Sequence, residues 1–325
     1  MTRQTTLWMA LIATLAGCGQ STDGDDQGFR NGVPRAETVQ MNVPGGSAQA
    51  LTLKTTSQAL LGEVAEYYKV TRAITGVVNG AALAVGGLVR LVLIHPPTSV
   101  TADQAVWGPW EDPLDPVAWR VTVTRVAEHQ YQYRFDGRPR TQPDADFVTV
   151  LSGTHSPGLV GGVEVERLGA GSFTLDWDAR ARLPQPNPDE VGKVSYIYSH
   201  ASDNGEVTIQ AAFRQVKDED TQLLADADYL FVREPSGAGS MDFVYTVPTA
   251  LKAGGRAVVR SRWQHTGAGR ADTQVRATNG DTASLSECWN ENYASVYKKT
   301  WLGGDNWGSE TDCAFPTAEY STLSP

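Results

Sequence analysis

The stretch "AWRVTVTRVAEHQYQYRF", residues 118–135, alternates apolar and polar side chains over almost its whole length. Side chains two positions apart lie on the same face of a β-strand, so this alternation predicts strands with one apolar face. A short turn near residue 129 divides the stretch into two such strands. Their large apolar residues are Trp119, Val121 and Val123, followed by Tyr131, Tyr133 and Phe135.

The same pattern recurs to about residue 276, in segments bounded by Gly, Pro, Asp and Asn. With turns such as "SDNG" at residues 202–205 between them, the segments predict about ten strands joined by short connections. The apolar sets are Phe147-Thr149-Leu151, Phe173-Leu175-Trp177, Val194-Tyr196-Tyr198, Val207-Ile209-Ala211-Phe213, Tyr229-Phe231 and Phe243-Tyr245-Val247.

These strands predict a mainly β fold. No helical stretch long enough for a parallel crossover separates them, so consecutive strands pair antiparallel as a meander. A twisted sheet of about ten strands curls or closes, and its apolar face must be covered. We expect a large curved antiparallel sheet or barrel, covered or filled by an N-terminal helix.

That helix is expected within residues 50–94. Leu60, Leu61 and Val64 begin an apolar face at three- and four-residue spacing, and residues 73–94 are apolar almost all round. This segment has three interpretations: a membrane span, a membrane-inserting element, or a helix buried against the sheet, which we favour. Four glycines would then allow another backbone to approach closely: Gly76, Gly80, Gly86 and Gly87.

The N-terminus has the features of an export signal, with Arg3 followed by a short apolar run. Leu15-Ala16-Gly17-Cys18 resembles the lipobox of bacterial lipoproteins, and the alternative is an ordinary secretory signal with an incidental cysteine. The resemblance implies cleavage after residue 17. It also implies a diacylglycerol on the Cys18 sulfur and an acyl chain such as palmitate on its amine. Because Gly19 follows, it implies the outer membrane.

The domain organisation follows from this reading. Residues 1–17 form the signal peptide, and residues 18–48, rich in Gly, Ser, Asp and Pro, are predicted to be a disordered tether. Residues 49–325 form a single domain of helix and antiparallel sheet with a disulfide-stapled C-terminal segment. The membrane, contacted through the lipid anchor, is one predicted partner; an apolar ligand or an envelope protein is another.

The other two cysteines, Cys288 and Cys313, are predicted to form a disulfide, since an exported chain meets oxidising conditions. Closing this loop contributes about 3.5 kcal/mol in the chain-entropy model. Two free thiols or an incomplete metal site are the alternatives. Between Ser284 and about Thr300 the sequence returns to helical spacing, with one predicted aromatic stripe on that helix: Trp289, Tyr293, Tyr297 and Trp301.

Charge excludes some partners. The chain has a net charge of −10, and removal of Arg3 with the leader leaves 26 basic against 37 acidic residues. This balance argues against nucleic-acid binding and against adhesion to anionic lipid headgroups.

Motifs for chemistry are weak. The five histidines have no metal-ligand spacing, and no G-x-S-x-G nucleophile motif exists. Ser152, His155 and Ser156 could form a serine–histidine dyad, but a polar turn is the simpler interpretation. Asp176 and Asp178 flank Trp177 as a glycosidase pair would, yet that face of a strand is ordinarily the solvated one. We therefore predict no catalytic residue, no metal and no cofactor.

"WGPWEDPLDP", residues 107–116, is the most distinctive string. Trp107 and Trp110 are expected to cap the core, with sugar or partner binding as the alternative. Together with "FVTVLSGTHSPG", "GSFTLDWDARARLP", "VRSRWQHTGAGRADTQV" and "SECWNENYASVY…CAF", it resembles a family of uncharacterised lipoproteins of myxobacteria and their relatives. The resemblance implies an envelope lipoprotein and carries no known activity.

Three functions are compatible with these observations. The first is a non-enzymatic envelope lipoprotein with a structural or binding role. The second is a periplasm-facing carrier of lipid or another apolar ligand, for which an open apolar cavity is required. The third, the least favoured, is a hydrolase of envelope glycans or peptides, which requires a cleft where acids or a Ser–His pair converge.

Overall fold

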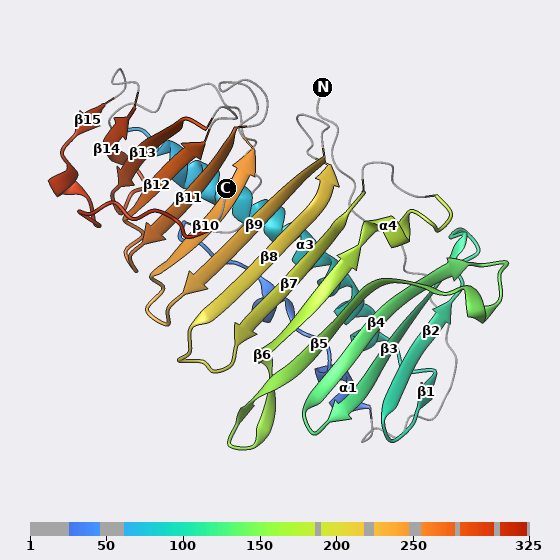
Figure 1. Cartoon of the computed structure of the whole chain (residues 1–325). Coiled ribbons are helices and arrows are strands. Elements are labelled where there is room, and N and C mark those ends of the chain that lie inside the picture. Colours follow the sequence, from blue (N-terminus) through green and yellow to red (C-terminus); the bar gives the residue numbers. More distant parts are fainter. Residues whose placement is uncertain are drawn as a thin grey trace.

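The computed structural model describes residues 26–45, 62–185, 190–217, 224–246, 255–276, 280–301 and 306–323. Within these ranges, fifteen strands form one antiparallel sheet in which every strand pairs with its neighbours in the sequence (Figure 1). The sheet is curved and open, not closed into a barrel, because β1 and β15 lie at opposite edges. The predicted meander is confirmed.

The strands are β1 Ser99–Val100, β2 Gln104–Trp110, β3 Val117–Ala127, β4 Gln130–Pro139, β5 Val148–Val160, β6 Val163–Asp176, β7 Lys193–His200, β8 Val207–Lys217, β9 Leu224–Arg233, β10 Gly239–Thr246, β11 Arg256–Trp263, β12 Gly269–Arg276, β13 Thr282–Trp289, β14 Ser295–Thr300 and β15 Trp307–Gly308. The helices are α1 Gln27–Asn31, α2 Ala36–Val39, α3 Glu66–Ile94 and α4 Trp177–Arg180, with 3₁₀ turns η1 Asp144–Asp146 and η2 Glu310–Asp312.

Alternation sets the register of the sheet. Val121 lies opposite Phe135 and Val123 opposite Tyr133, so the apolar residues of β3 and β4 meet on one face. This inner face continues through β7 and β8, where Tyr196 lies opposite Ala211 and is fully buried. A one-residue slip would turn these side chains to solvent, which is why the register is well defined.

Helix α3 covers the inner face and crosses the strands (Figure 1). Its N-terminal end contacts β13, where the Tyr67 backbone N–H donates to Glu287 at 2.7 Å. At its C-terminal end the His95 carbonyl accepts a hydrogen bond from the Trp107 indole at 3.1 Å. A 29-residue helix is about 43 Å long, which corresponds to about nine strand spacings in a flat sheet. Because the sheet is curved, β13 and β2 lie closer together than in a flat sheet, and the helix contacts both. The helix prediction is confirmed from Glu66 onward; Leu60 and Leu61 lie outside the described residues.

One side of α3 faces away from the sheet. Val77 and Leu83 are 55% and 50% exposed, while Val78 and Val85 are fully buried. Among the described residues, α3 is long and apolar enough to cross a membrane by length and composition alone, and 39% of its most apolar window is buried. The expectation of close backbone packing at its glycines is wrong, because no described atom lies within 4 Å of a Cβ placed at Gly76, Gly80, Gly86 or Gly87.

Residues 26–45 belong to the core, so the predicted disordered tether is wrong over this part of residues 18–48. The side chains of Phe29, Val33, Val39 and Met41 are at most 1% exposed and join the main apolar cluster. The Tyr196 hydroxyl donates to the Val39 carbonyl at 2.6 Å. The segment covers the part of the inner face that α3 leaves open. Residues 18–25, including Cys18, lie outside the described residues.

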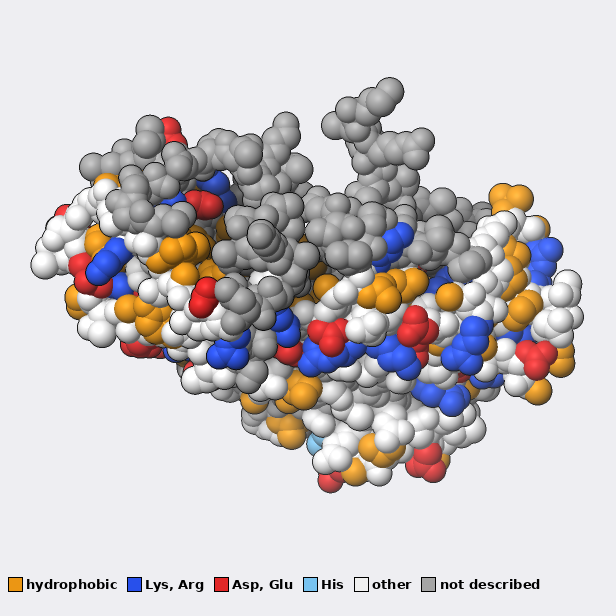
Figure 2. Space-filling model, turned by 45° about the horizontal axis from the view of Figure 1, so that its top comes forward, with side chains coloured by type: hydrophobic (Ala, Val, Ile, Leu, Met, Phe, Trp, Pro, Cys, Tyr) orange, Lys and Arg blue, Asp and Glu red, His pale blue; other side chains and the backbone are white. Residues whose placement is uncertain are grey.

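The outer face is polar, and its charges are paired between strands. Figure 2 shows acidic and basic side chains next to one another along the surface. Opposite charges that face each other across two strands stabilise a sheet modestly. The pairs are Arg120–Asp136, Lys193–Asp176, Arg214–Asp228 and Arg260–Asp242, with N···O distances of 3.1, 2.8, 2.6 and 2.9 Å.

The C-terminal helix predicted over residues 284–300 is wrong, because these residues form the hairpin of β13 and β14. The aromatic stripe is divided accordingly. Trp289 is buried against α3, Tyr297 packs beside the disulfide on the outer face, and Trp301 is 45% exposed. Tyr293 lies in the hairpin turn with a φ of 63°, which a helix does not contain.

Replacing Phe29 with alanine should destabilise the protein. Phe29 is 1% exposed, so the cavity should lower the free energy of unfolding by about 3 kcal/mol. Val126→Ala, at a position 51% exposed, is the control and should change it by less than about 0.5 kcal/mol. Urea denaturation measures both. Equal stability of the Phe29 variant and the wild type would mean that residues 26–45 are a tether after all.

Candidate functional site

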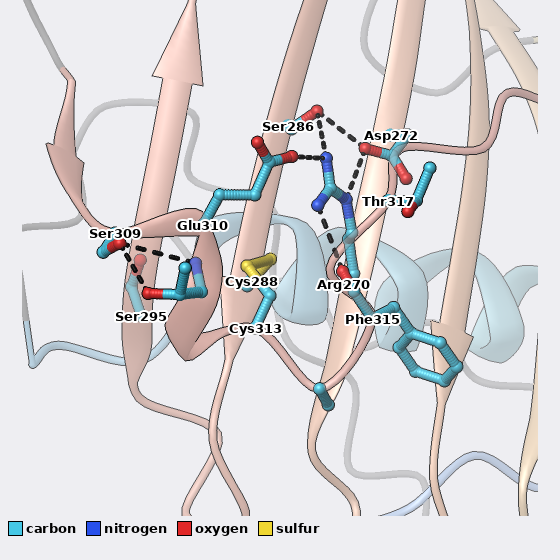
Figure 3. The surroundings of a disulfide bond; sticks show 12 residues. Arg270, Asp272, Ser286, Cys288, Ser295, Ser309, Glu310, Cys313, Phe315 and Thr317 are labelled. Atoms are coloured by element: carbon cyan, nitrogen blue, oxygen red, sulfur yellow. Dashed lines mark hydrogen bonds and ion pairs between the residues drawn. A yellow bond between two sulfur atoms is a disulfide. The ribbon is translucent and has the colours of Figure 1, made fainter.

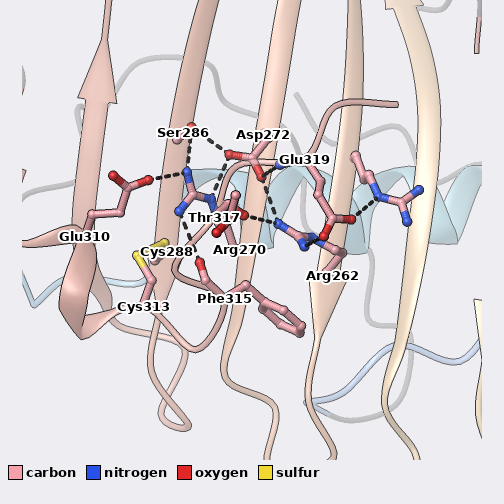
Figure 4. Close-up of polar contacts among 11 residues, drawn as sticks. Arg262, Arg270, Asp272, Ser286, Cys288, Glu310, Cys313, Phe315, Thr317 and Glu319 are labelled. Carbon is pink, nitrogen blue, oxygen red and sulfur yellow. Dashed lines mark hydrogen bonds and ion pairs between the residues drawn. A yellow bond between two sulfur atoms is a disulfide. The ribbon is translucent and has the colours of Figure 1, made fainter. Parts of the chain in front are cut away.

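The densest polar cluster lies on the outer face of β11, β12 and β13 (Figure 4). Arg270 donates from Nε to Asp272 at 2.8 Å and from Nη2 to the Ser286 hydroxyl at 3.3 Å. The Ser286 hydroxyl in turn donates to Asp272 at 2.6 Å, and Arg262 donates to the other Asp272 oxygen at 3.2 Å. Arg270 and Asp272 are two apart on β12 and so share a face, and Arg262 and Ser286 lie directly opposite them on β11 and β13.

The C-terminal segment, residues 309–320, closes over this cluster. Arg270 donates to the Phe315 carbonyl at 3.1 Å, and Arg262 to the Thr317 carbonyl at 2.9 Å. The Glu319 carboxylate lies 2.6 Å from Arg262, and its backbone N–H donates to Asp272 at 3.0 Å. The segment thus crosses three strands and shields the cluster from solvent.

The disulfide fixes one end of that segment (Figure 3). Cys288 of β13 and Cys313 are bonded, with Cα atoms 5.5 Å apart, and they are 0% and 8% exposed. The predicted pairing is confirmed. On the other side of Arg270, Glu310 forms an ion pair with its guanidinium at 2.7 Å.

The electrostatics of the cluster favour a structural role. Burial opposes the charge of Arg270, but hydrogen bonds from its guanidinium to Asp272 and Glu310 raise its pKa above the ordinary value. Three arginines (Arg260, Arg262 and Arg270) face four carboxylates (Asp242, Asp272, Glu310 and Glu319), so no excess positive charge is available for an anion. Arg270 is 1% exposed and Arg262 7% exposed, so both side chains are shielded from solvent. The cluster clamps the C-terminal segment onto the sheet.

A buried carboxylate lies on the opposite, inner face. Glu287 is fully buried, and its Oε2 accepts the backbone N–H of Tyr67 in the first turn of α3. Burial raises the pKa of Glu287, while the backbone N–H groups of Tyr67 and Glu66 and the charge of Lys298 lower it. Lys298 forms an ion pair with Glu66 at 2.8 Å. Negative charge at a helix N-terminus is stabilising, so Glu287 fastens this end of α3 to β13.

The third polar cluster surrounds His155 on the inner face. His155 Nδ1 lies 3.0 Å from the Tyr198 hydroxyl, which donates to the Thr154 carbonyl at 3.3 Å. Burial, with the charge of Arg35 as a smaller cause, lowers the pKa of His155 to about 3. Burial likewise raises the pKa of Tyr133 and of Tyr198. At neutral pH these groups are uncharged, which does not suit acid–base catalysis near that pH.

Two glycines make room for these tyrosines. A Cβ at Gly153 would lie 2.5 Å from the Tyr133 hydroxyl, and one at Gly171 would lie 2.6 Å from the Tyr198 hydroxyl. Both glycines face inward from strands opposite the rings they accommodate. Close approach of a side chain is a common reason for glycine inside a strand.

The residues considered for hydrolysis do not converge. On β5, His155 is buried on the inner face, whereas Ser152 and Ser156 are at odd spacing from it and face outward. Asp176 caps α4 by accepting the Ala179 N–H at 2.8 Å, and Asp178 accepts the Gly192 N–H at 2.8 Å. Each aspartate therefore has a local structural partner. Among the described residues, no group of three His, Cys, Asp or Glu side chains could hold a metal ion.

The tryptophan pair of residues 107–116 is part of the core. Trp107 is fully buried, and Trp110 is half-buried with its ring 5.7 Å from that of His95. Capping of the core is confirmed for Trp107. A bulge between the two residues accompanies the cis peptide bond of Gly108-Pro109.

Helices α1, α2 and α3 occupy the inner face, where a carrier would hold its ligand. Two open surface pockets outlined by the described residues have volumes of about 210 and 200 Å³. The first lies at β14 and β15 beside Trp307, and the second at the strand ends around His200 and Arg233. No observation on these residues favours the carrier.

Sequence reasoning missed the arginine clamp and Glu287. The alternation of Arg260 with Arg262, and of Arg270 with Asp272, carried a signal for cross-strand ion pairs. The C-terminal segment carried no such signal for its position, because residues 309–320 lack any apolar period.

Comparison with known proteins adds no relative. No family model, no curated protein and no solved structure matches this chain. The resemblance to uncharacterised myxobacterial lipoproteins stays a prediction.

Removing the disulfide should weaken the protein without dissolving the sheet. Cys288→Ser/Cys313→Ser frees a 25-residue loop, which should lower the free energy of unfolding by about 3.5 kcal/mol. The far-ultraviolet dichroism should stay near native, and the melting temperature should fall by several degrees. Thermal melts measure both.

A thiol count gives the complementary check. The wild-type mature protein, denatured without reductant, should show no free thiol. Two reactive thiols would contradict the disulfide.

Proposed function

We propose that the protein is a lipid-anchored, non-enzymatic protein of the bacterial envelope with a structural or binding role. Cys18 carries the acyl chains, and the outer membrane is the membrane that holds them. The folded sheet is the part that acts outside the bilayer.

The observation that carries this proposal is the buried disulfide between Cys288 and Cys313. Structural disulfides of this kind belong to oxidising compartments, and the cell envelope is one. The bond joins β13 to a C-terminal segment held mainly by polar contacts, so the fold is more stable under the oxidising conditions found outside the cytoplasm. With the signal sequence and the lipobox at Cys18, this supports export and anchoring.

The polar clusters support a role without catalysis. The arginines on the outer face bind the chain's own C-terminal segment, and Glu287 binds the chain's own helix. His155 is buried on the inner face of the sheet, and burial lowers its pKa to about 3, so it is neutral at neutral pH. Each cluster stabilises the fold through its contacts, so the accessible surface of the body is where a partner would act.

Changing Cys18 to alanine should abolish anchoring. Acylation needs the thiol, and two or more acyl chains are required for stable membrane attachment. The variant should remain an unprocessed precursor without acyl groups, as shown by mass spectrometry. Once its signal peptide is removed, the variant should also leave the detergent phase in a phase-partition assay.

The control is Cys288→Ser/Cys313→Ser, which removes two thiols but keeps Cys18. This variant should partition into detergent like the wild type. A Cys18→Ala protein that still partitions into detergent after complete removal of the signal peptide would contradict the proposal. Membrane attachment would then come from the apolar helix α3.

A further inference from the structure

Exposed apolar side chains gather at one end of the molecule, around α1. They lie at the C-terminal end of α3, in β1, and at the tips of the β3–β4 and β5–β6 hairpins. We call this set the apolar edge: Leu93, Ile94, Val100, Val126, Leu159, Val160 and Val163, which are 42%, 56%, 38%, 51%, 45%, 53% and 68% exposed.

Contacts to α1 and to Arg125 show that these segments are neighbours. Arg30 of α1 donates to the carbonyls of Leu93 and His95 at 3.1 and 3.2 Å. Asn31 donates to Glu164 of β6 at 2.8 Å, and the Arg125 guanidinium lies 4.8 Å from the Phe29 ring. The Arg125 N–H also donates to the Asp103 carbonyl, which brings in the turn after β1. Figure 1 shows α1, β1 and the two hairpin tips at the same end.

The β5–β6 hairpin has no polar side chain at its tip. Val160 pairs with Val163, and the two residues between them are Gly161 and Gly162, with φ of 60° and 83°. Positive φ at both positions is typical of a type I′ turn, which explains the glycines. It does not explain Leu159, Val160 and Val163, because exposed hairpin ends are ordinarily polar. These side chains project apolar surface beyond the sheet.

Most charges around the edge are paired with one another, and the Arg125 guanidinium lies over the rings of Phe29 and Tyr131. Asp26 with Arg30 and Arg167 with Asp203 form ion pairs at 2.7 and 2.5 Å, and the His129 ring forms a hydrogen bond with Glu164 at 2.6 Å. No surplus of positive charge is left to attract anionic headgroups. A membrane contact made here would therefore depend on apolar insertion, in keeping with the acidic character of the chain.

The anchor lies close to this edge in the sequence. The described chain begins at Asp26, eight residues after Cys18. Eight residues span at most about 28 Å, less than the ~43 Å length of α3. An acylated Cys18 therefore keeps the α1 end of the sheet within about 28 Å of the bilayer.

We propose that the apolar edge inserts into the lipid bilayer that holds the acylated Cys18. This inference rests on the proposed function, since it requires the lipid anchor. The hairpin tips then enter the acyl boundary, and the long axis of α3 leads away from the membrane. The sheet is held in one orientation, with its β13 end and C-terminal clamp farthest from the lipid.

A single-cysteine label tests this orientation. In the acylated wild type no free thiol is expected, so Val163→Cys gives one site for a polarity-sensitive fluorophore. Ile197→Cys is the matched control, because it is a β-branched strand residue 56% exposed in β7, outside the edge. Each full-length lipidated protein is reconstituted into vesicles of phosphatidylethanolamine and phosphatidylglycerol.

The label at position 163 should show blue-shifted emission, quenching by acyl-chain nitroxide lipids and loss of iodide quenching. The label at position 197 should show unshifted emission, no quenching by acyl-chain nitroxide lipids and full quenching by iodide. Equal iodide quenching at the two positions in a protein that mass spectrometry shows to be acylated would overturn the inference alone. A protein without acyl groups would overturn both the inference and the proposed function. If position 163 is protected from iodide in native envelope but not in vesicles that contain no other protein, the inference of bilayer insertion is overturned and a protein partner covers the apolar edge instead.

Discussion

The structure depends on covering the inner face of an open sheet. A meander of many strands with alternating residues has one wholly apolar face, and an open sheet cannot bury that face against itself. Helix α3 buries it by crossing the strands, and its own Val78, Val85 and Val92 are fully buried against the sheet. Residues 26–45 complete the cover beside β6 and β7. Without this cover the apolar rings of Phe173, Tyr196 and Phe231 would face solvent.

Both ends of α3 are fastened by polar contacts that the rest of the fold positions. At the N-terminal end, Glu287 accepts the Tyr67 N–H from a fully buried position. At the other end, Arg30 of α1 donates to the last carbonyls of the helix, including that of Val92. The C-terminal segment then binds the outer face of β11, β12 and β13, the last of which carries Glu287. It does so through Arg262, Arg270 and the disulfide. One end of the sheet is thus held from both faces.

Much of this fold was predictable from the sequence, because strand alternation is a local signal. Residues 118–135 alone define two strands and their register. The failures have physical causes. In β13, Glu287 occupies an inward position between Leu285 and Trp289, so a charge that caps α3 interrupts the apolar alternation and the aromatic spacing imitates a helix. In residues 26–45, Phe29, Val33 and Val39 have no regular period, because they are buried by distant strands and not by a local element. The arginine clamp depends on a segment without any pattern, so only its strand half was predictable.

Hydrogen exchange of the α3 backbone tests the central claim most directly, because it distinguishes a permanent cover from a displaceable one. The amides of residues 70–92 are compared by mass spectrometry with those of β7 and β8 in the folded protein. If α3 is the cover on which the sheet depends, its amides should exchange only in the global unfolding that also exposes β7 and β8. Rapid exchange throughout α3, with the strands still protected, would show that the sheet stands without its helix and would contradict this account.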